Sequence, residues 1–225
     1  MQEILDALIA DSIERPLPQL IRRQAEQPKA PGRALVVVGM RRSGKTWFCY
    51  QMIKDLVDQD VPRSQILVLN FEDERLLPFS APDFQILLDC FYKRTPENKS
   101  KTCYFFFDEI QRIEGWQLFI RRLLDSEKVE ITLTGSSAKM LSAEIHTSLR
   151  GRGLTTEIFP FSFQEYCTAQ GILIPTATPS SQEKSYLQKA CADFLVHGGF
   201  PETLGTTPET RRQILQQYLV SAEKV

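Results

Sequence analysis

One stretch constrains the fold of this chain more than any other: VVVGMRRSGKTWF, residues 36–48. It begins as a continuous apolar, β-branched run, passes through a glycine-bounded loop, and enters a segment with the apolar spacing of a helix. The loop fits the pattern G-x-x-x-x-G-K-[ST]. Between a buried strand and a helix, this pattern builds a phosphate-binding loop, called the P-loop below. The sequence therefore predicts a nucleotide site at the end of the first strand.

The main chain of such a loop binds the phosphates. Successive N–H groups form a concave anion nest, and the positive end of the following helix points at the ligand. We expect Lys45 to bring its ammonium to the β- and γ-phosphates, where it also assists catalysis, and the Thr46 hydroxyl to ligate Mg²⁺. The nucleotide-binding candidates are Gly39, Arg41, Arg42, Ser43, Gly44, Lys45, Thr46 and Trp47.

Two of these candidates, Arg41 and Arg42, are bulky residues in the middle of the loop. Main-chain binding allows their side chains to point outward, so their size is tolerated. Three roles are open to them. They could stabilise phosphate charge, reach a neighbouring protein or nucleic acid, or pair with surface acids.

Strand and helix signals alternate along most of the chain. Strands are predicted at residues 34–39, 65–72, 102–109, 129–137 and 154–162, and helices at 45–59, 84–92 and 114–127. The strands are apolar throughout rather than alternating, which indicates a sheet covered on both faces. Each parallel return needs a crossover connection. The sequence therefore predicts an α/β fold with a five-stranded parallel P-loop core.

The two ends of the chain carry helical signals only. Residues 1–23 are typical of a helix that breaks near RPLP, at residues 15–18. Three further helical segments follow residue 161: FQEYCTAQ, QEKSYLQKACADFLVH and ETRRQILQQYLVSAEKV. A linker rich in Thr, Pro and Ser separates the first two. We therefore expect a core with an N-terminal helix at residues 1–161 and a small helical lid at 162–225.

Two acids end the third predicted strand. A P-loop needs a carboxylate at the C-terminal edge of a neighbouring strand to hold Mg²⁺, directly or through water, and Asp108 is placed for that. Glu109 is the candidate general base for the attacking water. After the fourth strand, which we expect between the first and third, Ser136 could orient that water. Serine is also an ordinary turn former.

For each of the motifs SLRGRG and HGGFPE, two roles are consistent with the sequence. In SLRGRG, Arg150 or Arg152 could stabilise transition-state charge, in the same molecule or from a neighbour in a homo-oligomer; a solvated basic loop is the alternative. In HGGFPE, residues 197–202, the glycines and the proline suffice to stop a helix. Contact with the base or ribose of the nucleotide is the sharper alternative.

Composition narrows the class of protein. The formal net charge of −1 disfavours a constitutive binder of nucleic acid or anionic membrane, although a local basic patch stays open. The N-terminus lacks a secretory signal, and no apolar run approaches the roughly 20 residues that span a bilayer. The five cysteines never form C-x-x-C, which favours reduced, buried thiols over zinc or disulfides. We expect a cytoplasmic protein.

The motifs in this order resemble the archaeal and bacterial AAA-type ATP-binding proteins of the STAND-related branch. The likeness covers residues 13–218 and is carried by VVVGMRRSGKT, LNFEDERL, FFFDEIQRIEGWQLFIRRLLD, ITLTGSSAKMLSAEIHTSLRGR, IFPFSFQEY and HGGFPE. It implies an AAA+-like sheet order, ATP with Mg²⁺ as ligands, and an arginine-finger-like role for Arg150 or Arg152. Members of this group usually continue into a C-terminal domain, whereas this sequence stops at Val225. We expect either a truncated piece of a longer protein or a natural short form in which that domain is absent.

Three functions are consistent with these features. The first is a slow ATPase that uses its nucleotide state to reposition the lid or a partner. The second is a regulatory switch or scaffold that binds ATP or ADP tightly, with little turnover. The third is a DNA-associated ATPase, which the near-neutral charge disfavours. No particular protein partner is indicated.

Overall fold

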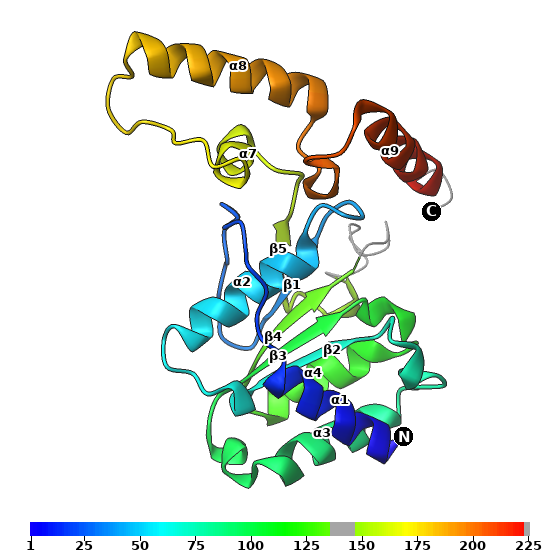
Figure 1. Ribbon diagram of the computed structural model, residues 1–225. Helices are drawn as coiled ribbons and strands as arrows, with labels where there is room; N and C mark the ends of the chain where they lie inside the picture. Colours follow the sequence, from blue (N-terminus) through cyan, green and yellow to red (C-terminus); the bar gives the residue numbers. More distant parts are fainter. Residues whose placement is uncertain (136–146, 223–225) are drawn as a thin grey trace.

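The computed structural model describes residues 1–135 and 147–222. Its centre is a five-stranded sheet in the order β2-β3-β4-β1-β5, and every neighbouring pair is parallel (Figure 1). The strands are β1 (Ala34–Val38), β2 (Ile66–Asn70), β3 (Cys103–Asp108), β4 (Val129–Thr134) and β5 (Gly153–Glu157). The predicted α/β class, the five parallel strands and the place of the fourth strand between the first and third are confirmed.

Helices cover the sheet on both faces, as the continuous apolar strands require. In β1, Val36 and Val38 pack into a cluster with α1 (Gln2–Glu14), α3 (Asp83–Arg94) and α4 (Trp116–Ser126). Leu35 and Val37 point the other way, into a cluster with α2 (Lys45–Val57). The first cluster is rich in aromatic residues, and Phe84 stacks on Phe119 with ring centroids 4.3 Å apart. β1 is therefore packed against helices on both of its faces, and the P-loop follows directly after it.

The end of α1 covers the free edge of β2. The Val68 N–H donates to the Ser12 hydroxyl at 3.1 Å. The Arg63 guanidinium donates to the carbonyls of Ser12 and Ile13. An edge strand whose N–H groups face solvent is a site for unwanted pairing, and here the helix end occupies that position.

Most elements end within a few residues of their predicted bounds, and two are markedly shorter. The N-terminal helix ends at Glu14, at the break predicted near residues 15–18. Residues 15–33 contain neither helix nor strand, so the helix expected from the break to residue 23 is wrong. Arg15 has a ψ of 126°, because the proline that follows it disfavours a helical backbone. The fifth strand ends at Glu157 rather than at residue 162. Pro160 has no N–H to continue the pairing.

Three helices follow β5 and lie together beyond the sheet: α7 (Phe163–Ala169), α8 (Ser181–His197) and α9 (Pro208–Ala222) (Figure 1). They occur where helices are predicted, and we call them the C-terminal helices. Ser162 and Ser180 each begin a helix with a reciprocal capping box. The cluster of buried residues within this group is small, with only Tyr166, Cys167 and Ala190 fully covered. Within the described parts of the chain, no helix has the length and apolar character needed to cross a membrane.

Candidate nucleotide site

Two glycines shape the P-loop where it leaves β1. Gly39 has a φ of 146°, and a Cβ there would lie 2.2 Å from the carbonyl oxygen of Ile158, so no side chain fits. Gly44 precedes α2 with a φ of 101°. Both backbone conformations are ones that residues with a Cβ rarely adopt. The loop therefore has the close turns that the glycine positions predict.

Lys45 lies under this loop. Its side chain is buried, and Nζ donates to the carbonyl oxygens of Gly39 at 3.0 Å and Met40 at 2.9 Å. Burial lowers the pKa of Lys45, and the nearby carboxylates of Glu109 and Asp108 oppose that shift. A cation is thus held where the main chain would surround phosphate oxygens.

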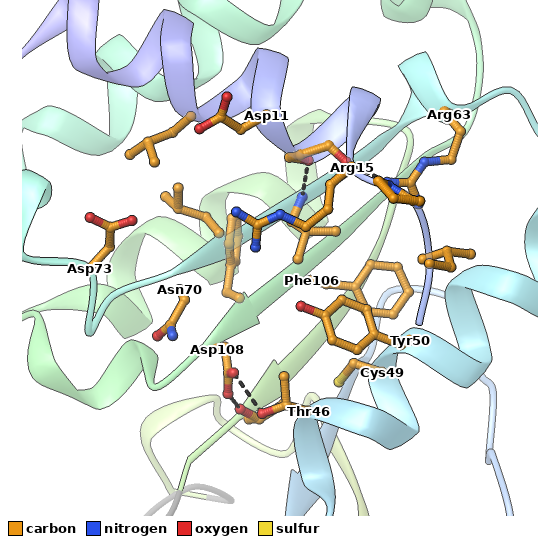
Figure 2. Close-up of a pocket in the computed structure, with 18 of the residues that line it drawn as sticks. Asp11, Arg15, Thr46, Cys49, Tyr50, Arg63, Asn70, Asp73, Phe106 and Asp108 are labelled. Atoms are coloured by element: carbon orange, nitrogen blue, oxygen red, sulfur yellow. Dashed lines mark hydrogen bonds between the residues drawn. The ribbon is translucent and has the colours of Figure 1, made fainter. Parts of the chain in front are cut away.

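Asp108 ends β3 beside the first turn of α2. The Thr46 hydroxyl donates to Asp108 Oδ2 at 2.9 Å, and the Thr134 hydroxyl, from the end of β4, donates to Oδ1. Burial raises the pKa of Asp108, while the bonds from the two threonines act to lower it. Figure 2 shows Thr46 and Asp108 facing each other at one end of a cavity of about 190 Å³, with Arg15 and Arg63 farther along its wall.

This set of residues fits Mg²⁺ and a phosphate group. Mg²⁺ prefers oxygen ligands and commonly takes only one or two from the protein, with phosphates and waters supplying the rest. Thr46 and Asp108 offer two oxygens in contact with each other. The described residues contain no group of three or more His, Cys, Asp or Glu side chains arranged around a common point. Inside the loop, Ser43 Oγ is buried and has no hydrogen-bond partner among the described residues, as expected of a cradle for a polar ligand.

Glu109 follows Asp108 in a strained backbone position. Its φ is 54°, in the left-handed region that a residue with a Cβ rarely adopts. The Gln111 side-chain amide donates to Glu109 Oε2. The charge of Glu109 influences the pKa values of Lys45 and Asp108, so its carboxylate lies at the same edge of the sheet. Gln111 is not among the sequence candidates; its only signal is its place in DEIQ.

The bulky residues of the P-loop point away from its interior. Arg42 has a φ of 63°, and its guanidinium lies 2.8 Å from both carboxylate oxygens of Glu202 in HGGFPE. Among the three roles open to Arg42, the structure therefore shows pairing with an acid. Arg41 is exposed. Trp47 is half exposed and meets Tyr50 edge to face.

Arg150 and Arg152 lie at the amino-terminal ends of the strands, whereas the P-loop lies at their carboxyl ends. The Arg152 carbonyl accepts from the N–H of Ala34 at the start of β1, and its side chain pairs with Asp125 of α4. The P-loop begins at the other end of β1, five residues or about 16 Å away. This position corrects one of our two expectations: neither arginine reaches the phosphates of its own molecule.

The motifs TLTGSS and HGGFPE remain to be placed in the structure. Ser136 lies outside the described residues. Among the described residues of TLTGSS, Thr134 contacts Asp108, and Thr134 is not among the predicted site residues. In HGGFPE, a Cβ on Gly199 would lie 2.2 Å from the carbonyl oxygen of Phe161, and the Phe161 N–H donates to the Gly199 carbonyl at 2.6 Å. The motif thus packs against the link between β5 and α7.

Comparison with known proteins agrees with this site. A family model described as "AAA domain" matches residues 31–167, from the turn before β1 into α7. An uncharacterized protein of Methanocaldococcus jannaschii is 37% identical over 218 residues, covering 96% of this chain and 47% of its own length. An uncharacterized protein of Haemophilus influenzae is 34% identical over 181 residues, covering 80% of this chain and 42% of its own length. The chain thus spans less than half of each of these relatives.

Among solved structures, one described as "Structure of C. elegans PCH-2" matches with a TM-score of 0.40 and 14% identity, covering 97% of this chain and 68% of that chain. A likeness this low carries no argument about function. The assignment rests instead on the family match, which includes β1, the P-loop, Asp108 and the start of α7. The chain belongs to the AAA domain family.

Proposed function

We propose that this chain binds ATP with Mg²⁺ and hydrolyses it slowly, and that the nucleotide state changes the position of the C-terminal helices or of a partner. One observation carries the proposal: the Thr46 hydroxyl lies 2.9 Å from Asp108 Oδ2 directly beneath the P-loop. AAA membership supports nucleotide binding in general terms. The choice of ATP, Mg²⁺ and hydrolysis rests on the chemistry of the residues.

Each residue has a defined task in this proposal. The P-loop N–H groups and Lys45 bind the β- and γ-phosphates, and Thr46 and Asp108 hold the metal. Bound Mg²⁺ supplies neutralisation of charge on the phosphate oxygens. Glu109, held by Gln111, accepts a proton from the attacking water, and Ser136 orients that water. The roles of Lys45, Thr46, Asp108 and Glu109 follow from their side-chain chemistry and from the sheet edge they share, and that of Ser136 follows from its place in the sequence.

Direct contacts support coupling between the P-loop and the C-terminal helices. Glu202, in the segment between α8 and α9, accepts from Arg42 of the P-loop and from the Tyr218 hydroxyl of α9. A ligand that moves the loop would therefore act on this segment. We further propose a division into a core at residues 1–161 and a lid at 162–225, which the separate small hydrophobic cluster of the C-terminal helices supports. From the resemblance of its motifs, we also propose that the protein belongs to the STAND-related branch and acts in the cytoplasm.

The second candidate function is a nucleotide-dependent switch with little turnover. The contacts of Glu202 favour it as much as they favour an ATPase, because a switch needs the same link between ligand and lid. The relatives extend well beyond the matched region, so an output domain in a longer protein would suit either function. The rate of ATP hydrolysis distinguishes the switch from the ATPase.

The deciding experiment compares the wild type with Lys45→Ala and Glu109→Gln. We expect calorimetry with Mg-ATP to show binding by the wild type and by Glu109→Gln, and no binding by Lys45→Ala. Steady-state hydrolysis should fall at least about 100-fold in Glu109→Gln, the usual contribution of a general base. Lys54→Ala, on an exposed face of the same helix, is the matched control and should behave as wild type.

Each alternative has its own result. Absence of binding heat in the wild type would refute nucleotide binding. Wild-type turnover in Glu109→Gln would show that the base is assigned wrongly. Tight binding with no turnover above the level of Glu109→Gln would establish the switch instead of the ATPase.

A further inference from the structure

Arg23 occupies a central place that its sequence context does not indicate. It belongs to the irregular segment between α1 and β1, yet it is only 7% exposed. Its main chain is fixed to α2 on both sides: the N–H donates to Gln51 Oε1 at 2.6 Å, and the carbonyl accepts from Gln51 Nε2 at 3.2 Å. The side chain therefore starts from an anchored position beside the first turns of the P-loop helix.

The Arg23 guanidinium joins three segments that are distant in sequence. Its Nη1 donates to the Ser43 carbonyl of the P-loop at 2.8 Å, and Nη2 donates to the Phe159 carbonyl after β5. Its Nε donates to Glu165 Oε1 of α7 at 3.0 Å. The planar fork of arginine allows these bonds to point in different directions at once, which a lysine ammonium on a flexible stem reproduces poorly.

Glu165 is the partner on the side of the C-terminal helices. Both side chains of the pair are 6% exposed. The Glu165 carboxylate also accepts from the N–H groups of Gln24 and Ser162, each at 2.8 Å, so its lone pairs are satisfied. Burial alone would raise the pKa of Glu165, but these N–H bonds and Arg23 outweigh it and leave the pKa below its usual value. The Glu165 carboxyl is therefore ionised at neutral pH.

The same guanidinium also fits tightly against the P-loop glycine. A Cβ on Gly44 would lie 2.9 Å from Arg23 Nη1. Gly44 and the Ser43 carbonyl thus both lie against the Arg23 guanidinium, and Glu165 of α7 binds the same guanidinium. A displacement of α7 would have to move this guanidinium, break its bond to the P-loop, or leave a buried charge without its partner, which is costly.

We infer that Arg23 is a positioning residue that couples helix α7 to the P-loop through Glu165 and thereby sets the affinity for Mg-nucleotide. This inference rests on the proposed function. It differs from the Arg42–Glu202 contact, whose side chains are 59% and 40% exposed and which surface screening weakens. The buried Arg23–Glu165 pair is therefore the contact through which a displacement of α7 would alter the P-loop.

The test measures nucleotide affinity in the full chain by calorimetry with Mg-ATP. We expect Arg23→Lys and Glu165→Gln each to raise Kd at least tenfold, although neither side chain contributes a P-loop N–H, a metal ligand or the general base. The double variant should resemble the single variants, because both changes break one connection. Arg22→Lys is the matched control; Arg22 is exposed, pairs with Asp55 on the surface, and should leave Kd within twofold of wild type.

A second readout needs no variant. Since coupling is reciprocal, Mg-ATP should slow amide hydrogen exchange in α7 of the wild type. Glu165→Gln should abolish that protection. If Arg23→Lys does not fold, Glu165→Gln and the exchange measurement still decide the question.

Two results would overturn the inference alone. One is wild-type Kd values in folded Arg23→Lys and Glu165→Gln, even with lowered thermal stability, because the residues would then only hold the fold. The other is unchanged exchange in α7 when the wild type binds Mg-ATP. If the wild type binds no Mg-nucleotide, the proposed function and this inference both fail, and the calorimetric control on the wild type identifies that case.

Discussion

At the scale of single residues, the site keeps an ionisable acid in a place that disfavours its charge. Burial raises the pKa of Asp108 above its ordinary value. Between the unfolded and folded pKa values, the folded protein then binds more protons than the unfolded protein. The stability of the nucleotide-free protein therefore falls as the pH rises through this window, and the loss is complete above the folded pKa.

A neutral isostere should remove that loss. We expect Asp108→Asn to raise the Tm of the nucleotide-free protein at pH 7 by roughly 2–4 °C, the shift that about 1 kcal/mol produces at this size. The same change should abolish Mg²⁺-dependent hydrolysis. Thermal unfolding at pH 4 and pH 7 provides the measurement, and the gain should shrink at the lower pH. Asp58→Asn, at an exposed acid, serves as the control; a lower Tm in Asp108→Asn would contradict the account.

The chemistry of the P-loop could be predicted from the sequence because its residues are contiguous. Gly39, Lys45 and Thr46 all come from one local pattern, and Asp108 needs only the parallel sheet to bring it near. The contacts of Arg42 with Glu202 and of Arg23 with Glu165 join residues far apart in sequence. No local pattern encodes such pairs, because they depend on where the C-terminal helices pack.

At the scale of elements, Gly199 controls how the end of α8 meets the link between β5 and α7. Its missing side chain allows a contact with Phe161 that a Cβ would block, since the clash is with backbone. We expect Gly199→Ala to cost about 1–3 kcal/mol of unfolding free energy, the range for overpacking a close contact. Chemical denaturation provides the measurement.

The control separates close packing from backbone strain. Gly171 has a φ of 68° but open space around it, so Gly171→Ala tests the backbone effect without a clash. The hypothesis requires a larger loss in Gly199→Ala than in Gly171→Ala. Equal losses would show that the close approach to Phe161 is unimportant.

The elements themselves were largely predictable, and the failures have identifiable causes. The central strands β1 and β3 are buried along most of their length, so their apolar runs stand out, whereas β5 is half exposed; all five occur where predicted. The helix expected up to residue 23 ends at Glu14, at the break predicted near residues 15–18, and does not resume. Proline decides the conformation of residues 15–33 instead, and the segment is stabilised by tertiary contacts such as those of Arg23 with Gln51.

At the scale of the whole molecule, the position of Arg150 and Arg152 determines whether a second copy is needed to bring them to a nucleotide. Both arginines lie at the sheet edge opposite the P-loop, so any contact with a nucleotide must come from a second copy. If they stabilise transition-state charge from a neighbouring molecule, hydrolysis per molecule should rise with protein concentration. Arg150→Ala or Arg152→Ala should then lower turnover at least about 1,000-fold, the usual contribution of such an arginine, and leave binding intact.

A mixing experiment tests this assembly directly. Lys45→Ala lacks a working P-loop but keeps its arginines, while the arginine variant has the reverse defect. Mixed together, the two inactive proteins should recover part of the wild-type activity. A concentration-independent rate with no recovery on mixing would leave these arginines with surface roles, such as the ion pair of Arg152 with Asp125.

The strand order also determines when this protein can finish folding. β1 lies between β4 and β5, so Val36 must pair with Leu133 and Thr155, which are synthesised much later. At about 5–20 residues per second, the ribosome leaves β1 without neighbours for roughly 5–20 s after it emerges. β2 and β3 find each other across a far shorter stretch of chain. The strand that carries the nucleotide loop therefore gains both of its neighbours only after most of the chain has been synthesised.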